Sequence, residues 1–409
     1  MRVCCQEVRR GWTMVFCGKL GGLFIIGINR PFFLCNGSSD EREGQSMEKK
    51  KAYLLLANGQ VFEGQSFGAC GTTIGEIVFT TGMTGYQETL TDPSYYGQIA
   101  VQTFPLIGNY GINSMDNESG RCWMKGYIAR EFCDEPSNFR CEMTIEAFLK
   151  REGIIGLCGI DTRALTRVIR EFGVMNGMIT TEDVYANRDA YLKQIQAFVI
   201  RDAVKNVTIP EPEVYKAENG QYHVVLMDFG YKRNILRKLL EVGCHVTVVP
   251  AYTSAEDILA YQPDGIMLSN GPGDPEENTE IIANLQKLIK AQVPIFGICL
   301  GHQLMALANG GKTYKLKYGH HGTNQPVKDI ANDKVYVTSQ NHNYAVDEKT
   351  LDPAIAEMSH FNVNDKSCEG IRYSNAPAFT VQFHPEACSG PRDTMCLFES
   401  FIQLMKEDK

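Results

Sequence analysis

The residues whose types and spacing best suit chemistry lie around Cys299, within residues 293–303. The apolar first half of this stretch is typical of a short buried strand, and residues 300–307 are typical of a helix. Cys299 therefore lies between a strand and a helix, where helix N–H groups favour a thiolate. Gly297 and Gly301 flank it, as in the elbow of hydrolases, because a sharp turn leaves no room for Cβ atoms. This pattern predicts a nucleophile, against the plainer interpretation of a buried structural thiol.

A nucleophilic cysteine needs a base, because a free thiol with a pKa of about 8.5 is only slightly ionised at neutral pH. Residues 379–383 alternate in polarity as a strand does, and His384 and Glu386 follow two residues apart. Both side chains can therefore point the same way at the end of the strand. We expect His384 to be the base and Glu386 to orient it and stabilise its imidazolium.

A second glycine-containing stretch, residues 269–275, also follows an expected strand. Its Gly271 and Gly273 leave backbone N–H groups open, and such groups can stabilise an acyl oxygen that develops negative charge. The alternative is a plain turn at the end of a strand. A phosphate-binding loop fits poorly, because no Lys-Ser or Lys-Thr pair follows the glycines.

The elements that must position these residues alternate between strand and helix. We expect strands at 223–228, 246–249, 265–269 and 293–298, and helices at 234–241, 255–261 and 277–291. This alternation predicts an α/β fold with a mostly parallel, doubly wound sheet. Ligands of such sheets bind beyond the carboxyl ends of the strands, where Cys299 and residues 269–275 are expected to lie.

The first half of the chain has a different pattern, typical of a smaller mixed α/β domain. Asn58-Gly59 between two apolar runs predicts a hairpin, and residues 76–80 and 99–103 predict further strands. Residues 84–95 are expected to form a loop. Helices are expected at 145–152 and at 162–172, the second with Asp161 as N-cap and Gly173 as its end. We expect domains at 47–202 and 222–409, joined by a proline-containing linker at 203–221.

Composition excludes several classes of function. The chain has 409 residues, enough for two domains, and its net charge of −8 argues against nucleic-acid or anionic-membrane binding. Its 14 cysteines include no Cys-x-x-Cys pair, so we expect reduced thiols in a cytoplasmic protein rather than disulfides or a metal site.

Residues 1–46 differ in character from the rest of the chain. Their apolar run at 20–28 is interrupted by glycines and is too short to span a bilayer. We expect a disordered extension that precedes a natural start at Met47; a transit peptide is the weaker alternative.

Three stretches together resemble the class I, triad-type glutamine amidotransferases: residues 297–303, residues 269–275 and His384-Pro-Glu386. Further stretches resemble the carbamoyl-phosphate synthetase small-subunit family in particular. They are residues 228–234, 318–322 and 340–345 in the second half, and residues 83–88, 91–95 and 160–163 in the first half. The resemblance covers the chain from about Ala52 onward.

The resemblance implies a reaction and roles for particular residues. Cys299 would attack the carboxamide of L-glutamine to form a glutamyl thioester, with His384 as base and then acid. Backbone N–H groups of Gly271 and Leu300 would hold the oxyanion. Glutamine would be bound by Ser94, Gly271, Gly273, Leu300, Gln303, Asn341, Asn343 and Tyr344. The family usually has Gly-Phe where this chain has Asn343-Tyr344.

The resemblance also implies a partner. The chain carries no ATP-binding signature, so ATP and Mg would be used by a large subunit that receives ammonia and makes carbamoyl phosphate for arginine and pyrimidine biosynthesis. No cofactor and no metal are expected in this chain. The alternatives are a stand-alone cysteine amidohydrolase, another class I amidotransferase subunit, and a subunit that only binds.

Overall fold

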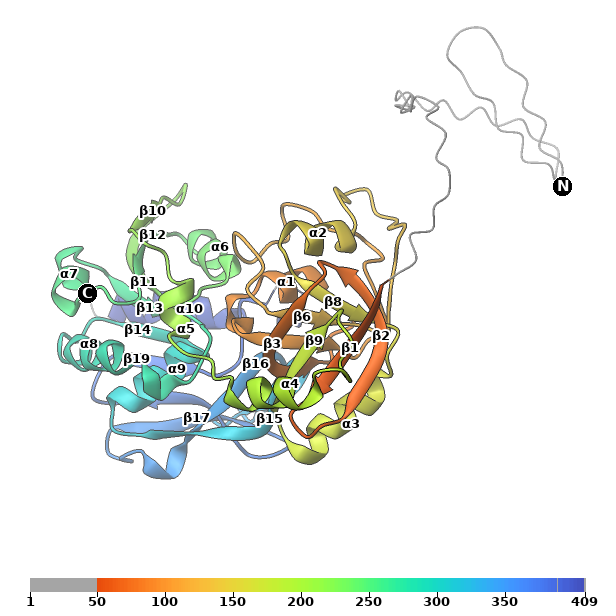
Figure 1. Ribbon diagram of the computed structural model, residues 1–409. Helices are drawn as coiled ribbons and strands as arrows, with labels where there is room; N and C mark the ends of the chain where they lie inside the picture. Colours follow the sequence, from red (N-terminus) through yellow and green to blue (C-terminus); the bar gives the residue numbers. More distant parts are fainter. Residues whose placement is uncertain (1–49, 388, 408–409) are drawn as a thin grey trace, which may run out of the picture. The chain divides into compact units, whose positions relative to one another are not determined.

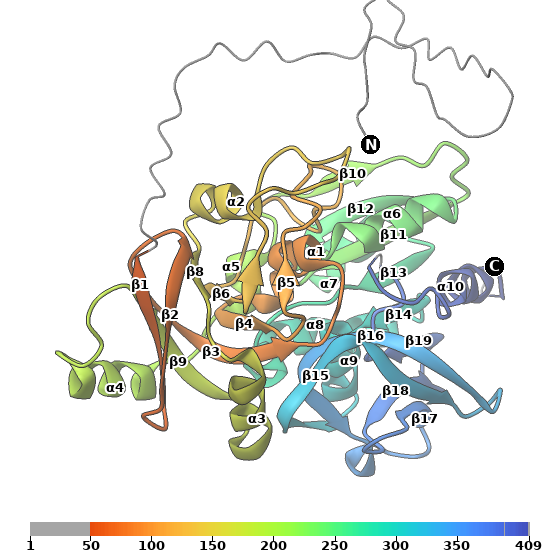
Figure 2. The same ribbon diagram turned by 90° about the vertical axis from the view of Figure 1, so that its right-hand side faces the viewer.

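The computed structural model describes residues 50–387 and 389–407 of the chain. The prediction of a disordered extension at residues 1–46 lies outside this described part. Two bodies of secondary structure follow one another along the described chain, a barrel and then a large sheet covered by helices (Figures 1 and 2). Among the described helices, none is both long enough and apolar enough to cross a membrane.

The first body is a closed barrel. Its strands are β1 (Lys51–Leu56), β2 (Val61–Gly68), β8 (Ile155–Cys158), β6 (Gly126–Ile128), β4 (Gln98–Gln102), β3 (Thr72–Thr80) and β9 (Met175–Thr180), in this spatial order. The predicted hairpin is confirmed: β1 pairs antiparallel with β2, and Gly59 in the turn has a φ of 86°. The barrel closes because β9 pairs antiparallel with both β1 and β3. A closed barrel buries its aliphatic side chains without leaving open strand edges.

Short helices surround the barrel. They are α1 (Tyr86–Thr91), η1 (Pro93–Tyr95), α2 (Ile145–Arg151), α3 (Thr162–Phe172) and α4 (Arg188–Ala197); the small strands β5 (Leu106–Ile107) and β7 (Glu131–Phe132) pair beside it. Helix α5 (Ala203–Val207) follows them and packs on the second body, because Val204 shares an apolar cluster with Phe229 and Leu268. The predicted N-cap of α3 is confirmed, because the side chain of Asp161 accepts a hydrogen bond from the backbone N–H of Ala164 at 2.9 Å.

The expectation of a loop over residues 84–95 is wrong, because this segment contains α1 and η1. Helix α1 is only six residues long, and its N-cap Gly85 supplies no capping side chain. It therefore shows neither the apolar periodicity nor the start signal on which a helix prediction depends.

The second body is built on a sheet whose ten strands all lie in the described part of the chain. The strands, in spatial order, are β10 (Glu213–Tyr215), β12 (Cys244–Pro250), β11 (Tyr222–Asp228), β13 (Gly265–Leu268), β14 (Ile295–Ile298), β19 (Ala378–Val381), β18 (Cys368–Tyr373), β17 (Ala356–Asn362), β15 (Lys312–Asp329) and β16 (Lys334–Asp347). Strands β12, β11, β13, β14 and β19 are parallel.

The prediction of a mostly parallel sheet is therefore wrong in extent, and the sheet is mixed. Edge strand β10 and strands β18, β17, β15 and β16 all pair antiparallel with their neighbours. Strands β15 and β16 form one long hairpin that contains many polar residues and register shifts. Such a hairpin lacks the continuous apolar runs that mark buried parallel strands.

Helices cover both faces of the parallel part of the sheet. Helices α7 (Ala255–Ala260), α8 (Thr279–Lys290) and α9 (Leu300–Ala308) share one apolar cluster with Val225 and Met227 of β11. Helices α6 (Arg233–Glu241) and α10 (Cys396–Glu407) share another with Val224 and Leu226 of the same strand. Successive side chains of a strand point to opposite faces, so one strand contributes to both cores.

The expected linker at residues 203–221 contains regular structure, namely α5 and the edge strand β10. Its prolines, Pro210 and Pro212, precede β10, where no ladder hydrogen bond is lost. The boundaries of the two domains remain predictions.

Candidate active site

Cys299 lies in the sharp turn between β14 and α9. Its φ of 52° and ψ of −103° are uncommon for a residue with a side chain. A Cβ added to Gly301 would lie 2.5 Å from the carbonyl oxygen of Leu268, and one added to Gly297 would lie 3.1 Å from the carbonyl oxygen of Gly301. The prediction that this turn leaves no room for Cβ atoms is therefore confirmed. The turn holds Cys299 beyond the carboxyl end of a parallel strand.

The thiol of Cys299 is buried, with 2% of the residue exposed. Burial raises its pKa strongly, and the carboxylate of Asp92 adds to this rise. The ammonium group of Lys232 and the backbone N–H of Leu300, which hydrogen-bonds the sulfur, oppose it only in part. The resting sulfur therefore carries its proton at neutral pH, so a base must remove that proton before the sulfur can attack.

His384 and Glu386 lie just beyond the next parallel strand, β19. Ile298 of β14 pairs with Val381 of β19, and the backbone N–H of Cys299 donates to the carbonyl of Val381 at 2.9 Å. This pairing brings the thiol and the imidazole to the same edge of the sheet. The Nδ1 atom of His384 lies 2.7 Å from Oε1 of Glu386. Because a carboxylate only accepts, Nδ1 is the donor. The other ring nitrogen, Nε2, is buried and hydrogen-bonds no described residue.

Lys232, which the sequence analysis did not single out, completes this arrangement. Its Nζ lies 2.6 Å from Oε1 of Glu386, and both side chains are almost fully buried. Burial by itself would raise the pKa of Glu386, but the charge of Lys232 and the hydrogen bond from His384 outweigh it and hold that pKa at about 2. Glu386 is thus a carboxylate at neutral pH, as an orienting residue must be.

A cavity of about 300 Å³ opens beside the thiol, a volume suited to a small molecule. It brings together most of the predicted site residues: Ser94, Gly271, Gly273, Cys299, Gln303, Asn341, Asn343 and Tyr344. Leu300 is not among its lining residues, although its N–H reaches the sulfur. His384 lines a smaller neighbouring hollow, and Asn341 lines both.

Ser94 comes from the barrel part of the chain, on η1. Its hydroxyl accepts a hydrogen bond from the side chain of Asn270 at 2.9 Å, and Asn270 directly precedes Gly271. Elsewhere in the lining, Nε2 of Gln303 donates to the carbonyl of Tyr344 at 2.8 Å. Residues far apart in the sequence are therefore fixed to one another around the cavity.

His321, which was also not singled out, connects two of the predicted residues. Its ring nitrogens lie 2.8 Å from Oδ1 of Asn341 and 2.8 Å from Oδ1 of Asn343. Each asparagine in turn donates to a carboxylate of the barrel part, Asn341 to Asp92 at 3.2 Å and Asn343 to Glu76 at 2.8 Å. In the sequence, His321 lies within residues 318–322, a stretch that resembles the family, but this stretch does not reveal whether His320 or His321 faces the cavity.

Comparisons with known proteins agree with this geometry. The sequence model of one protein family, the carbamoyl-phosphate synthase small chain, CPSase domain, matches residues 54–179. The sequence model of a second family, the class-I glutamine amidotransferases, matches residues 225–404. The carbamoyl phosphate synthase small chain of Syntrophotalea carbinolica is 50% identical over 375 residues, which cover 88% of this chain and 99% of the relative. The small chain of Bacillus anthracis is 51% identical, over 88% of this chain and 97% of the relative. That of Clostridium perfringens is 49% identical, over 86% of this chain and 99% of the relative. The chain therefore belongs to the carbamoyl phosphate synthase small chain family, an enzyme family, and carries a class-I glutamine amidotransferase domain.

Proposed function

We propose that this chain hydrolyses L-glutamine to glutamate and ammonia through a thioester on Cys299, and that it passes the ammonia to a large subunit. The observation that carries the proposal is the position of Cys299, on a strained turn beside the cavity, at the sheet edge that also holds the hydrogen-bonded pair of His384 and Glu386.

The first step is activation of the thiol. The sulfur is protonated at rest because burial raises the pKa of Cys299. His384 donates its Nδ1 hydrogen to Glu386, so the lone pair on Nε2 is free to take the thiol proton. The imidazolium that forms is stabilised by the carboxylate of Glu386, which Lys232 keeps ionised.

The sulfur then attacks the carboxamide carbon of glutamine, and the carbonyl oxygen becomes negatively charged. Backbone N–H groups of Gly271 and Leu300 are proposed to bind this oxygen. The two residues lie against each other, because a Cβ added to Gly271 would be 2.7 Å from a side-chain carbon of Leu300 and 2.3 Å from the carbonyl oxygen of Phe229. The absence of a side chain at position 271 thus allows the close approach that such a site needs.

Collapse of the tetrahedral intermediate breaks the C–N bond. The proton held on Nε2 of His384 goes to the departing nitrogen, which leaves as ammonia, and a glutamyl thioester remains on Cys299. Water, deprotonated by the same nitrogen, then hydrolyses the thioester to glutamate and restores the thiol.

Glutamine is proposed to be held by the polar residues that line the cavity. They are Ser94, Gly271, Gly273, Gln303, Asn341, Asn343 and Tyr344, together with Leu300. The side chain of Asn343 is engaged by His321 and Glu76, so it is directed by its neighbours rather than free to move within the cavity. The amide-rich lining suits a ligand that carries both a carboxylate and an ammonium group.

The relatives are named as small chains of a synthase, which supports a large-subunit partner for this chain as well. We propose that the partner uses ATP and Mg to make carbamoyl phosphate from bicarbonate and the delivered ammonia. The product would serve arginine and pyrimidine biosynthesis in the cytoplasm. Ser94, on the barrel part, favours this function over that of a stand-alone amidohydrolase, because the barrel part contributes to the cavity.

Acid quenching tests the thioester. Purified chain is mixed with carbon-labelled glutamine, quenched in acid within one turnover, and separated from free label. We expect label on the wild-type chain that hydroxylamine releases, and none on Cys299→Ser. Cys244→Ser, which alters another buried thiol, should retain the label. Label that persists on Cys299→Ser would refute the proposed nucleophile.

A further inference from the structure

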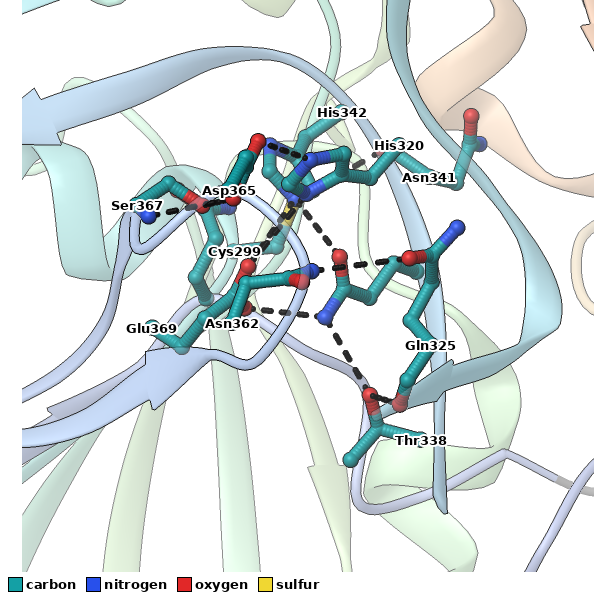
Figure 3. Close-up of polar contacts among 12 residues, drawn as sticks. Cys299, His320, Gln325, Thr338, Asn341, His342, Asn362, Asp365, Ser367 and Glu369 are labelled. Carbon is teal, nitrogen blue, oxygen red and sulfur yellow. Dashed lines mark hydrogen bonds and ion pairs between the residues drawn. The ribbon is translucent and has the colours of Figure 1, made fainter. Parts of the chain in front are cut away.

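A cluster of two histidines and one glutamate lies on the antiparallel part of the sheet, and none of the three residues belongs to the proposed triad (Figure 3). His320 and His342 face each other in the ladder between β15 and β16, and Glu369 comes from β18. One nitrogen of each ring and one oxygen of the carboxylate lie within 4.8 Å of one another. All three residues are buried, and Glu369 is fully so.

The hydrogen bonds of His342 determine which of its ring nitrogens carries hydrogen. Nδ1 lies 2.8 Å from the backbone carbonyl of Tyr344, which can only accept, so Nδ1 carries the hydrogen. In the neutral ring, Nε2 then carries a lone pair. That lone pair faces Oε1 of Gln340 at 3.2 Å and Oε1 of Glu369 at 4.0 Å.

The orientation of Gln340 is also determined. Its side-chain nitrogen donates to Oε2 of Glu369 at 3.0 Å and to Oγ1 of Thr338 at 3.2 Å, which directs its oxygen toward His342. His320 has its Nε2 2.8 Å from Asp365 and its Nδ1 3.3 Å from Oε1 of Glu369. When Nε2 donates to Asp365, the second nitrogen of a neutral ring presents another lone pair to the cluster.

When His320 is neutral, four electron-pair donors converge: Nδ1 of His320, Nε2 of His342, Oε1 of Glu369 and Oε1 of Gln340. Donors that face one another in a buried space repel unless a positive centre lies between them. We propose that this cluster is a binding site for a divalent transition-metal ion of the Zn²⁺ type, which ties β15, β16 and β18 together.

The geometry suits such an ion. A tetrahedral ion with bonds of about 2.0 to 2.1 Å holds its ligand atoms about 3.3 Å apart. The pair formed by His320 and Glu369 is separated by 3.3 Å and the pair formed by His342 and Gln340 by 3.2 Å, close to the expected spacing. His342 and Glu369 are 4.0 Å apart, and the ligand atoms of the two histidines and Glu369 all lie within 4.8 Å, so the cluster has to contract around the ion. Histidine and carboxylate ligands suit zinc and its neighbours in the first transition row.

The surroundings are those of a metal-binding histidine pair. Ligating histidines generally donate their second ring N–H to a carboxylate or a backbone carbonyl, and here His320 does so to Asp365 and His342 to Tyr344. Asp365 is itself fixed by the backbone N–H and hydroxyl of Ser367, at 3.1 and 2.8 Å. With four protein donors the site is closed, which is typical of a structural ion rather than a catalytic one.

The alternative occupant is a proton. Burial lowers the pKa of His320, but hydrogen bonds to Asp365 and Glu369 outweigh it and raise that pKa to about 9. A proton on Nδ1 of His320 would satisfy Glu369. The lone pair on Nε2 of His342 would still face a lone pair on Oε1 of Gln340, at a distance of 3.2 Å. A metal ion removes both repulsions at once.

The ion would adjoin the glutamine cavity, because its ligand His342 also lines that cavity. His342 lies between Asn341 and Asn343, and the carbonyl of Tyr344 accepts from both His342 and Gln303. Fixing His342 therefore fixes the stretch of β16 that lines the cavity. The sequence analysis expected no metal here, because the ligands lie on three separate strands with no short spacing between them.

The test is the zinc content of the full, untagged chain. The chain is treated with EDTA, incubated with a small excess of Zn²⁺, desalted, and analysed for metal by mass spectrometry. Cys299→Ser serves as the background, so that zinc on the nucleophilic thiol is not counted. We expect one Zn²⁺ per chain in this background and a loss of most of it when Glu369→Gln is added.

His360→Gln is the matched control, because His360 is buried and faces a carboxylate, Asp329 at 4.0 Å, outside the cluster. It should retain one ion. Cobalt supplies a readout that needs no change to the cluster: the Co²⁺-loaded chain should show the visible bands of a tetrahedral ion and no thiolate charge-transfer band. A chain that binds no ion, retention of the ion by Glu369→Gln, or a thiolate band would overturn the proposal and leave a proton as the occupant.

Discussion

Removal of the charge at Lys232 should destabilise the whole fold, because Lys232 is the buried partner of Glu386. The pKa of Glu386 is about 2 in the folded chain against 4.5 for an unperturbed glutamate. At about 1.4 kcal/mol for each unit of pKa, this difference corresponds to about 3 kcal/mol of stability at neutral pH. The value agrees with the roughly 3 to 5 kcal/mol lost when one partner of a buried ion pair is removed.

We therefore expect Lys232→Met to lower the free energy of unfolding by about 3 kcal/mol at pH 7, measured by urea denaturation. The matched control is Lys238→Met on α6, the helix that directly follows Lys232. Lys238 has an ion pair of the same 2.6 Å length with Glu241, but that glutamate is exposed. An exposed pair contributes at most about 1 kcal/mol, so the control should lose little. The double variant Lys232→Met with Glu386→Gln should recover much of the loss, because Glu386 then no longer leaves an unpaired buried charge.

The contribution of Glu386 to the free energy of unfolding changes with pH in a definite direction. A carboxylate whose pKa is depressed by folding stabilises the folded state fully above its unfolded pKa. For Glu386 this contribution is complete above about pH 4.5 and is lost as the pH falls toward about 2. The difference between wild type and Lys232→Met should therefore be constant from pH 7 to about 5 and shrink below that. The reasoning would be refuted if Lys232→Met lost no more unfolding free energy than Lys238→Met. It would also be refuted if the loss in Lys232→Met stayed the same in acid.

Three further changes test the proposed site. Cys299→Ser should abolish glutamine-dependent carbamoyl phosphate synthesis in the complex and leave ammonia-dependent synthesis intact; loss of both would indicate a structural role. Ser94→Ala should raise the KM for glutamine more than it lowers kcat in steady-state assays, and an effect on kcat alone would contradict its role in binding. Gly271→Ala places a Cβ 2.3 Å from the carbonyl oxygen of Phe229, so glutaminase activity should fall and stability should drop by about 1 to 3 kcal/mol. A Cβ at position 120 would meet nothing within 4 Å, so Gly120→Ala should change neither the glutaminase activity nor the stability. Equal effects of the two substitutions would refute the steric argument.

The features predicted well from the sequence are local. The turn at Cys299 follows from two glycines and an apolar run, and the cap of α3 follows from Asp161. The signal for each feature lies within a few residues of the chain. Pairing of β14 with β19 places Cys299 and His384 beyond the ends of neighbouring strands, as the rule for parallel sheets predicts.

The features that could not be predicted depend on contacts between distant residues. Lys232 follows β11 with no pattern that indicates its buried partner, Glu386. His321 joins Asn341 and Asn343 only because β15 and β16 pair as a long hairpin. Closure of the barrel likewise depends on pairing of β1 with β9, which no local periodicity specifies. Tertiary pairing of this kind decides the partners of polar side chains, and a single sequence does not show it.

The most direct test of the proposed function is glutamate release from glutamine by the purified chain, alone and mixed with a carbamoyl phosphate synthase large subunit, bicarbonate and MgATP. We expect slow release by the chain alone that rises strongly in the complex, with Cys299→Ser inactive in both. Fast release that the large subunit does not change would indicate a stand-alone amidohydrolase, and no release under either condition would indicate a subunit that only binds; either result would contradict a coupled glutaminase.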